Sequence, residues 1–342
     1  MAGEVIGLAS ALRRELAARN GVWAAGHSHV ESYGAEPVVV YEPEEKGHGN
    51  FIDGAYGAIV ERPEWHKRFN KVHSQWRSLP KAESGRRWRE LDSSVSSDAL
   101  LMNVFCTPEV NSSAAICSLL GVEGGDLPEF GWKARVPLGN GRFDRTEVDM
   151  RWGGLLVEAK LTETDFQTRA VAMVAGYRDF AEVFDAEMLP AVEIRTSRRR
   201  QAVEFAEEFT QEWEDGGDEE AARAFQSALV DQARAQESFE PGYAGYQLIR
   251  NVLAAHATGS RFCVVLDERR PDLREQWFRV MAAVRRAELR TRLAVVTWQE
   301  LTPLLPADLR EFLERKYGIA APGGAAMPVD ELKRELRRDR RQ

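Results

Sequence analysis

The chain has 342 residues, of which 54 are acidic and 46 are Lys or Arg, so its formal net charge is -8. This length allows a full hydrophobic core in one large or two modest domains. The charge argues against a protein that coats nucleic acid, although a local basic face would suffice beside an active site. No apolar run has the length of a membrane span and the N-terminus has no secretory apolar region, so we expect a cytoplasmic protein outside the membrane.

The first 92 residues are predicted to form an accessory region that is largely helical and partly basic. A helix is expected over 5–18 and a short strand over 37–41. The segment 62–89 is basic and contains three interleaved tryptophans, Trp65, Trp76 and Trp88. An ordinary solvated helix with its tryptophans turned inward is the favoured interpretation, and binding of a nucleic-acid backbone with base stacking is the alternative.

The next elements alternate between helix and strand. Ser96, Ser97 and Asp98 can cap the free amides of a helix over 99–105, with further helix expected over 114–120. A strand over 131–136 then precedes a turn cluster at 138–141. Much later, two short β-branched runs flank a helix over about 273–289, which predicts buried strands joined by a crossover helix. These runs cover residues 261–266 and 293–298.

Between these parts, the sequence predicts a helical insertion over about 165–240. Apolar residues recur at helical spacing from Phe166 to Phe184, which predicts one amphipathic helix that ends near Leu189. Further helices are expected over 201–236. A helix over 243–257 then carries Gln247 and Asn251 one turn apart.

Residues 147–160 predict a β-hairpin whose two faces differ in chemistry. Gly153 and Gly154 form a two-residue turn signal. Pairing outward from the turn places Asp149 opposite Glu158 and Glu147 opposite Lys160. Because side chains alternate along a strand, one face is entirely apolar. It contains Val148, Met150, Trp152, Leu155, Val157 and Ala159. The other face contains Glu147, Asp149, Arg151, Leu156, Glu158 and Lys160.

The polar face of this hairpin predicts a metal site. Directly opposed residues have β-carbons about 5 Å apart. Two carboxylates at that separation, Asp149 and Glu158, repel each other by about 3 kcal/mol at an effective dielectric constant near 20. A divalent cation such as Mg²⁺ or Mn²⁺ would offset this repulsion, because hard cations prefer carboxylate oxygens.

Asp149, followed by Glu158-Ala159-Lys160 in a hairpin, resembles the signature of the PD-(D/E)XK nuclease superfamily, which includes restriction endonucleases. The order of helix, three strands, helix and strand agrees with the core of that superfamily. The resemblance implies an α/β fold with a mixed central sheet of four to five strands flanked by helices. It implies a nuclease core over residues 93–317, including the insertion, before a linker and charged tail over 318–342.

By the same resemblance, Asp149, Glu158 and the backbone carbonyl of Ala159 would hold the ion. Lys160 would orient or deprotonate the attacking water and stabilise charge on the phosphorane, and deprotonation would require a lowered pKa. Hydrolysis would then leave a 5′-phosphate and a 3′-hydroxyl.

Three further residues are candidates for the site, each with a structural alternative. Gln247 resembles a glutamine that assists the metal in several branches, but the usual tyrosine four residues later is absent, and a helix-surface role is the alternative. Asp98 could contribute an acid, or could simply favour the start of its helix. Glu147 could be a metal ligand or lysine-orienting group, and a plain salt bridge with Lys160 is slightly favoured.

The predicted function is therefore metal-dependent hydrolysis of phosphodiester bonds, with DNA as the favoured substrate. One alternative is a catalytically inactive, nuclease-like subunit for binding or scaffolding, and another is an unrelated α/β protein. Restriction, phage defence and repair all fit. The sequence leaves open whether the chain forms a homo-oligomer or works with a partner subunit. Finally, the three cysteines have no metal-ligand spacing and predict reduced core thiols.

Overall fold

A mixed five-stranded sheet forms the centre of the computed structural model, which describes residues 7–33, 36–45, 47–73, 76, 79–197 and 237–339. The strand order is β12-β11-β7-β6-β3. Strand β6 is antiparallel to both β3 and β7, whereas β7, β11 and β12 are parallel to one another. The strands are β3 (Glu129–Lys133), β6 (Glu147–Trp152), β7 (Leu155–Ala159), β11 (Arg261–Leu266) and β12 (Leu293–Thr297). The predicted mixed α/β fold is confirmed.

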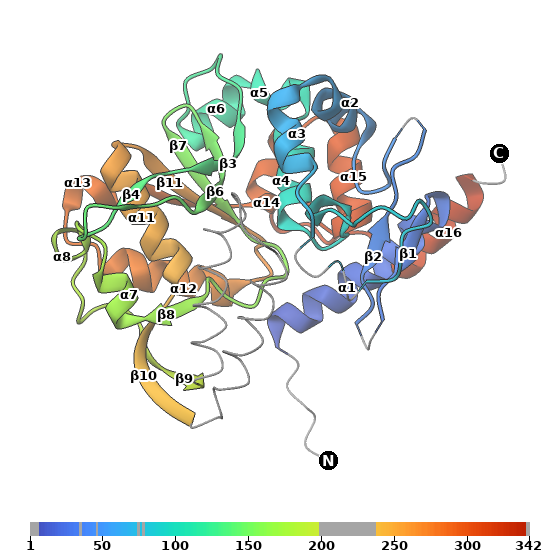
Figure 1. The fold of residues 1–342 in the computed structure, drawn as a ribbon. Helices are drawn as coiled ribbons and strands as arrows, with labels where there is room; N and C mark the ends of the chain where they lie inside the picture. Colours follow the sequence, from blue (N-terminus) through green and yellow to red (C-terminus); the bar gives the residue numbers. More distant parts are fainter. Residues whose placement is uncertain are drawn as a thin grey trace.

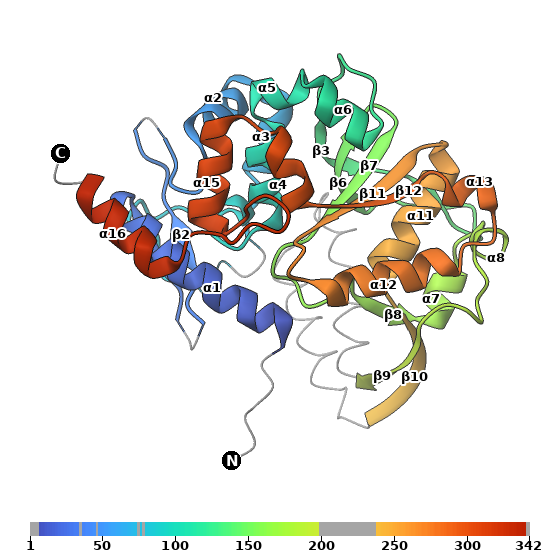
Figure 2. The same ribbon diagram turned by 180° about the vertical axis from the view of Figure 1, so that it is seen from behind.

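Helices cover both faces of this sheet, and each face has its own apolar cluster. Helices α11 (Tyr246–Thr258) and α12 (Pro271–Ala282) pack on one face, around residues such as Leu156 and Phe262. Helix α4 (Ser97–Phe105) packs on the other face, around residues such as Val157 and Val265. Figures 1 and 2 show these two helical layers on opposite sides of the strands. As predicted, α4 begins at a cap, because the Ser96 hydroxyl accepts a hydrogen bond from the Ala99 amide.

The N-terminal segment and the tail pack together beside this core. Helix α1 (Leu8–Trp23) contacts both α15 (Ala307–Tyr317) and α16 (Val329–Asp339). Both views show α1 and α16 side by side (Figures 1 and 2). Leu332 of the predicted charged tail is fully buried. Leu12 and Leu16 share an apolar cluster with Leu313, so the predicted accessory region contributes to the same core.

The remaining elements are short. The N-terminal third adds η1 (Ala24–Gly26), β1 (His29–Glu31), β2 (Val39–Tyr41), α2 (Asp53–Glu61), α3 (Pro63–Phe69) and η3 (Glu90–Asp92). Beyond α4 lie α5 (Pro108–Asn111), α6 (Ala114–Leu120), α13 (Ala287–Arg290), α14 (Trp298–Leu301) and η4 (Thr302–Leu304). All three cysteines are free and buried, which agrees with the prediction of core thiols.

The prediction of one amphipathic helix from Phe166 to Phe184 is wrong. Gln167 has a φ of 62°, which a right-handed helix does not allow, and the next residues pair with a strand instead. The segment forms β8 (Thr168–Ala170), α7 (Val171–Ala175) and α8 (Phe180–Val183). Its aromatic residues are nevertheless buried, so the periodicity identified core positions but not the backbone conformation.

The predicted insertion begins and ends as strands in the described part of the chain. Strands β9 (Ala191–Ser197) and β10 (Glu237–Ala244) pair antiparallel, and β8 joins the outer side of β10. Figure 1 shows this arm extending away from the central sheet. The helices expected over 201–236 lie outside the described residues.

The strand predicted over 131–136 is divided in two. Strand β3 ends at Lys133, and β4 (Val136–Pro137) then pairs with β5 (Phe143–Asp144). Arg135, at the break, has a φ of 42°, which few residues with a side chain adopt. The predicted turn over 138–141 connects β4 and β5, where Gly141 has a φ of 82°.

Candidate active site

The predicted hairpin is present, and its register is confirmed next to the turn. Gly153 has a φ of 54°, and Trp152 pairs with Leu155, as does Met150 with Val157. The paired ladder ends there. Asp149 and Glu158, which were predicted to be direct cross-strand partners, therefore lie beyond the paired residues of β6 and β7.

Beyond Met150, the side chains of β6 no longer follow one alternation. Met150 belongs to the apolar cluster of Val157, whereas Val148 belongs to the cluster on the other face of the sheet, with Leu156. The prediction that Val148 shares a face with Met150 is thus wrong. On the neighbouring strand, Gly131 has a φ of 64° at the same level, which indicates a local distortion of both strands.

This distortion sets the position of Asp149. Its carboxylate accepts a hydrogen bond from the backbone amide of Ala159, with 2.9 Å between Oδ2 and N. The side chain of Asp149 remains 20% exposed, although its strand neighbours Val148 and Met150 are fully buried. Asp149 therefore connects the interior of the hairpin to the surface.

Glu158 and Lys160 form a buried ion pair on the same hairpin. Lys160 Nζ donates to Glu158 Oε1 at 2.7 Å, and the two residues are 4% and 1% exposed. The second oxygen of Glu158 accepts a hydrogen bond from Asn251 Nδ2, also at 2.7 Å. Both carboxylate oxygens are therefore held by donors.

Asn251 is the residue that the sequence prediction missed. It lies on α11 one turn after Gln247, is fully buried, and has a side-chain oxygen without a hydrogen-bond partner. Gln247 itself lines the cleft beside Asp149, and the described contacts of Glu158 involve Asn251 instead. A polar residue within the apolar run from Ile249 to Ala255 was the signal that could have identified Asn251.

The acids of the site raise the pKa of Lys160. Burial alone would lower the pKa of this ammonium group, but Glu158, Glu163 and Asp149 raise it above its usual value. A lysine that deprotonates water would need a lowered pKa, and these neighbouring acids have the opposite effect. Lys160 is a cation at neutral pH.

The pKa of Asp149 is raised to about 8. Burial contributes most, followed by repulsion from the carboxylates of Glu158 and Asp98, and Lys160 and Arg68 oppose the shift. The raised pKa shows that the protonated form of Asp149 is favoured, mainly because its carboxyl group is removed from water.

Arg68, from helix α3, brings two further predicted residues to the site. Its guanidinium donates to Asp98 Oδ2 at 2.5 Å and to Glu147 Oε2 at 2.9 Å, and lies 3.7 Å from Asp149 Oδ1. Arg68 is 7% exposed. Burial would lower its pKa, but Asp98, Asp149 and Glu147 raise it. The sequence had placed Arg68 only in a generally basic segment.

Glu147 does not contact Lys160 as predicted. It pairs with Lys133 of β3 in the strand ladder, and its carboxylate forms ion pairs with Arg68 and Lys71. The salt bridge expected between Glu147 and Lys160 is therefore wrong, because the β6–β7 ladder ends before it reaches them.

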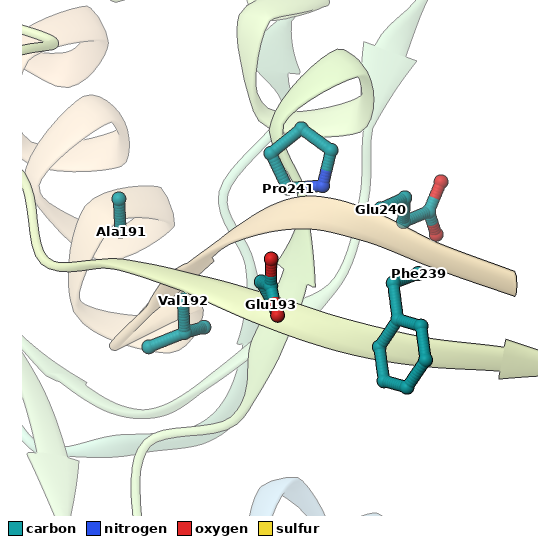
Figure 3. A pocket seen from close by; sticks show the side chains of 6 residues that line it. All are labelled: Ala191, Val192, Glu193, Phe239, Glu240 and Pro241. Carbon is teal, nitrogen blue, oxygen red and sulfur yellow. The ribbon is translucent and has the colours of Figure 1, made fainter.

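A cleft of about 770 Å³ opens beside Asp149 and Glu147. Its cationic lining comes from Arg68, Lys71, Lys133 and Arg145. A smaller hollow of about 360 Å³ lies on the β9–β10 arm, where Val192 and Phe239 meet two glutamates (Figure 3). That hollow has no basic lining residue, whereas the cleft beside Asp149 has four, which suits an anionic substrate.

A family model described as a restriction endonuclease associating with ARP matches residues 17–318. The chain belongs to this restriction-endonuclease family. The match includes the C-terminal end of α1, the segment that carries Arg68, the hairpin and α15, so it covers most of the predicted accessory region as well as the core. No curated protein and no solved structure matches the chain. In the part of the chain that the structure describes, no helix is long and apolar enough to cross a membrane.

Proposed function

We propose that this chain is a metal-dependent nuclease that hydrolyses phosphodiester bonds in DNA. The observation that carries the proposal is that Asp149, which lines a cleft together with four cationic residues, accepts a hydrogen bond from the strand that carries the buried pair Glu158 and Lys160. Membership of a restriction-endonuclease family supports the same reaction class. A cationic cleft attracts the phosphate backbone, and an acid pair with a lysine suits chemistry at one phosphate.

The donor set of the site fits a Mg²⁺ or Mn²⁺ ion that keeps several water ligands. Among the described residues there is no group of three or more His, Cys, Asp or Glu side chains arranged as a metal site. Mg²⁺ commonly uses only one or two carboxylates, with water and substrate phosphate completing its shell. Repulsion from Glu158 and Asp98 contributes to the raised pKa of Asp149, and a cation would relieve that repulsion. Asp149, Glu158 and the carbonyl of Ala159 would hold the ion, which supplies Lewis-acid polarisation and a more acidic bound water.

The residues of the chain then have distinct roles. Lys160 remains protonated beside Glu158, so it stabilises negative charge that develops on the phosphate rather than removing a proton from water. Asn251 fixes the orientation of Glu158 from the opposite side. Because both partners are buried, the carboxylate cannot rotate freely, and the site is ordered before substrate binds.

Arg68 balances the charge of the outer acids. It contacts Asp98 and Glu147 and lies near Asp149, so these carboxylates remain together without strong mutual repulsion. Asp98 and Glu147 thereby act on Asp149 through Arg68, as positioning residues.

A second candidate function is a nuclease-like subunit without catalysis. The observation that favours it is that each oxygen of Glu158 already has a protein donor. The family description names association with ARP, and under either function we propose that the chain works with a partner.

Cleavage assays separate the two functions. Purified protein is incubated with linear, circular and single-stranded DNA in Mg²⁺, in Mn²⁺ or in EDTA. We expect metal-dependent cleavage that is lost in Lys160→Ala and kept in Lys316→Met, which changes a buried lysine far from the cleft lining. Absence of metal-dependent cleavage, or cleavage unchanged in Lys160→Ala, would defeat the catalytic proposal.

A further inference from the structure

The cleft beside Asp149 is lined by side chains of two kinds besides its acids. The cations include Lys71 and Lys133, and the apolar and aromatic residues include Phe143, Met173 and Tyr246. Its volume of about 770 Å³ lies within the range of pockets that enclose a small organic ligand. The cleft can therefore accept both the phosphate and the base of a nucleotide.

Phe143 is the exposed aromatic residue of this cleft. It lies on β5, is 42% exposed, and belongs to none of the apolar clusters formed by the described residues. Core packing therefore does not explain its position. An exposed ring in a cleft beside active-site acids is available to a ligand.

The backbone and a cation both support the position of the Phe143 ring. The guanidinium carbon of Arg135 lies 4.6 Å from the ring centroid. Arg135 is one of two described non-glycine residues with positive φ, at 42°, a conformation that costs energy and persists only where the surroundings impose it. The unfavourable backbone at Arg135 thus accompanies the contact of its guanidinium with a ring that lines the cleft.

The chemistry of nucleic acids selects the occupant. In an intact duplex each base is stacked on its neighbours, so an enzyme reaches its face only after the nucleotide is unpaired or turned out. Aromatic side chains stack readily on the bases of single strands, while cations follow the backbone. A single cleft lined by Phe143 together with Lys71 and Lys133 matches this second pattern.

We propose that the cleft binds an unpaired nucleotide, with its base stacked on Phe143 and its phosphate directed towards Lys71, Lys133 and Asp149. The substrate is then a single strand or a duplex with locally unpaired nucleotides, rather than an intact duplex. This inference rests on the proposed nuclease function, but it can fail independently, because it concerns binding and not hydrolysis.

The test measures binding in EDTA, so that hydrolysis plays no part. Fluorescence anisotropy is recorded for a labelled 12-nucleotide DNA strand, its RNA equivalent, the blunt DNA duplex, and that duplex with one looped-out nucleotide. We expect the full-length protein to bind the single strands and the looped-out duplex about 10-fold more tightly than the blunt duplex. Backbone charge alone predicts the opposite order, because a duplex has the higher charge density.

Three variants assign the preference to the ring. Phe143→Ala and Phe143→Leu should remove it, whereas Phe143→Trp should retain it, because only the aromatic face is needed. Phe278→Ala changes a Phe that is 47% exposed on α12 and lies outside the cleft lining, so it should bind like the unaltered protein. Phe143 is outside the core, and circular dichroism should show all four variants folded.

Two results would overturn the inference. One is a blunt duplex bound as tightly as the single strand, and the other is a preference that persists in Phe143→Ala. Cleavage in Mg²⁺ is scored separately. If blunt duplex is cleaved in a Lys160-dependent way and single strands are not preferred, the inference is wrong and the nuclease function is supported. If single strands are preferred through Phe143 and no DNA is cleaved, the inference is supported and the nuclease function is wrong.

Discussion

Lys160 and Lys316 are two buried lysines with opposite surroundings. Lys160 is 4% exposed and lies against Glu158, and its pKa is raised by neighbouring carboxylates. Lys316 is 0% exposed, and its ammonium group donates hydrogen bonds to the neutral side chains of Asn20 and Tyr41. Burial lowers the pKa of Lys316 well below its usual value.

This difference shows that burial alone does not define a functional lysine. Equal removal from water produces a stabilised cation at Lys160 and a destabilised one at Lys316, because only the first has acids beside it. The contrast predicts that Lys160 takes part in the reaction as a cation. It also predicts that Lys316 has only a structural role and that a positive charge on it lowers the free energy of unfolding.

The largest expected effect is on catalysis. Lys160→Ala should lower the rate of DNA cleavage by about 10³-fold, because the cation that stabilises charge on the phosphate is removed. Lys316→Met should leave the rate unchanged. Cleavage is measured under single-turnover conditions with circular dichroism as a check of folding. Equal losses in the two variants would remove the distinction between the lysines.

A third buried cation, Arg68, tests the role of the acids. Arg68→Met should lower the free energy of unfolding in EDTA by about 3 kcal/mol, because Asp98, Glu147 and Asp149 lose their shared partner. The measurement is urea denaturation. Arg279→Met is the control, because Arg279 forms an exposed ion pair with Glu275 and should change stability by less than about 1 kcal/mol. Added Mg²⁺ should recover part of the loss in Arg68→Met.

Lys316→Met should raise the free energy of unfolding at pH 7 by about 2 kcal/mol, since it removes a buried cation that has no acid beside it. The sign of the pH effect follows from the lowered pKa. Between the folded pKa and the usual value of 10.5, the unfolded chain binds more protons, so the unaltered protein gains stability as pH rises. The difference in free energy of unfolding between Lys316→Met and the unaltered protein should therefore become smaller from pH 7 to pH 10. A constant difference across that range would contradict the lowered pKa of Lys316.

The smallest effect concerns the neutral partner of Glu158. Asn251→Leu should lower the cleavage rate by about 10-fold, equivalent to about 1.4 kcal/mol, and should raise the Mg²⁺ concentration needed for half-maximal activity. Gln247→Leu, one turn earlier on the same helix, should leave the Mg²⁺ requirement unchanged. The reverse result would restore the sequence-based role of Gln247 at the metal.

Prediction from sequence succeeded where the pattern was local. The turn at Gly153, the cap at Ser96 and the buried strand over 261–266 all follow from neighbouring residues, and the structure confirms them. The prediction of a helix from Phe166 to Phe184 was wrong because part of this segment pairs with the distant strand β10. Its buried residues nevertheless have the spacing of an amphipathic helix. Local periodicity reports which residues are buried, but not always in which backbone form.

The sequence by itself determined the mixed α/β order, the hairpin and the residues Asp149, Glu158 and Lys160, because turn chemistry and side-chain alternation act over a few residues. Only the tertiary structure decided how far the hairpin pairs, and which partners reach the acids. Arg68 lies 81 residues before Asp149, and Asn251 lies 102 residues after it. No local sequence pattern connects positions so far apart. Their charges and donors meet at the hairpin because α3 packs against β3 and α11 packs against β7.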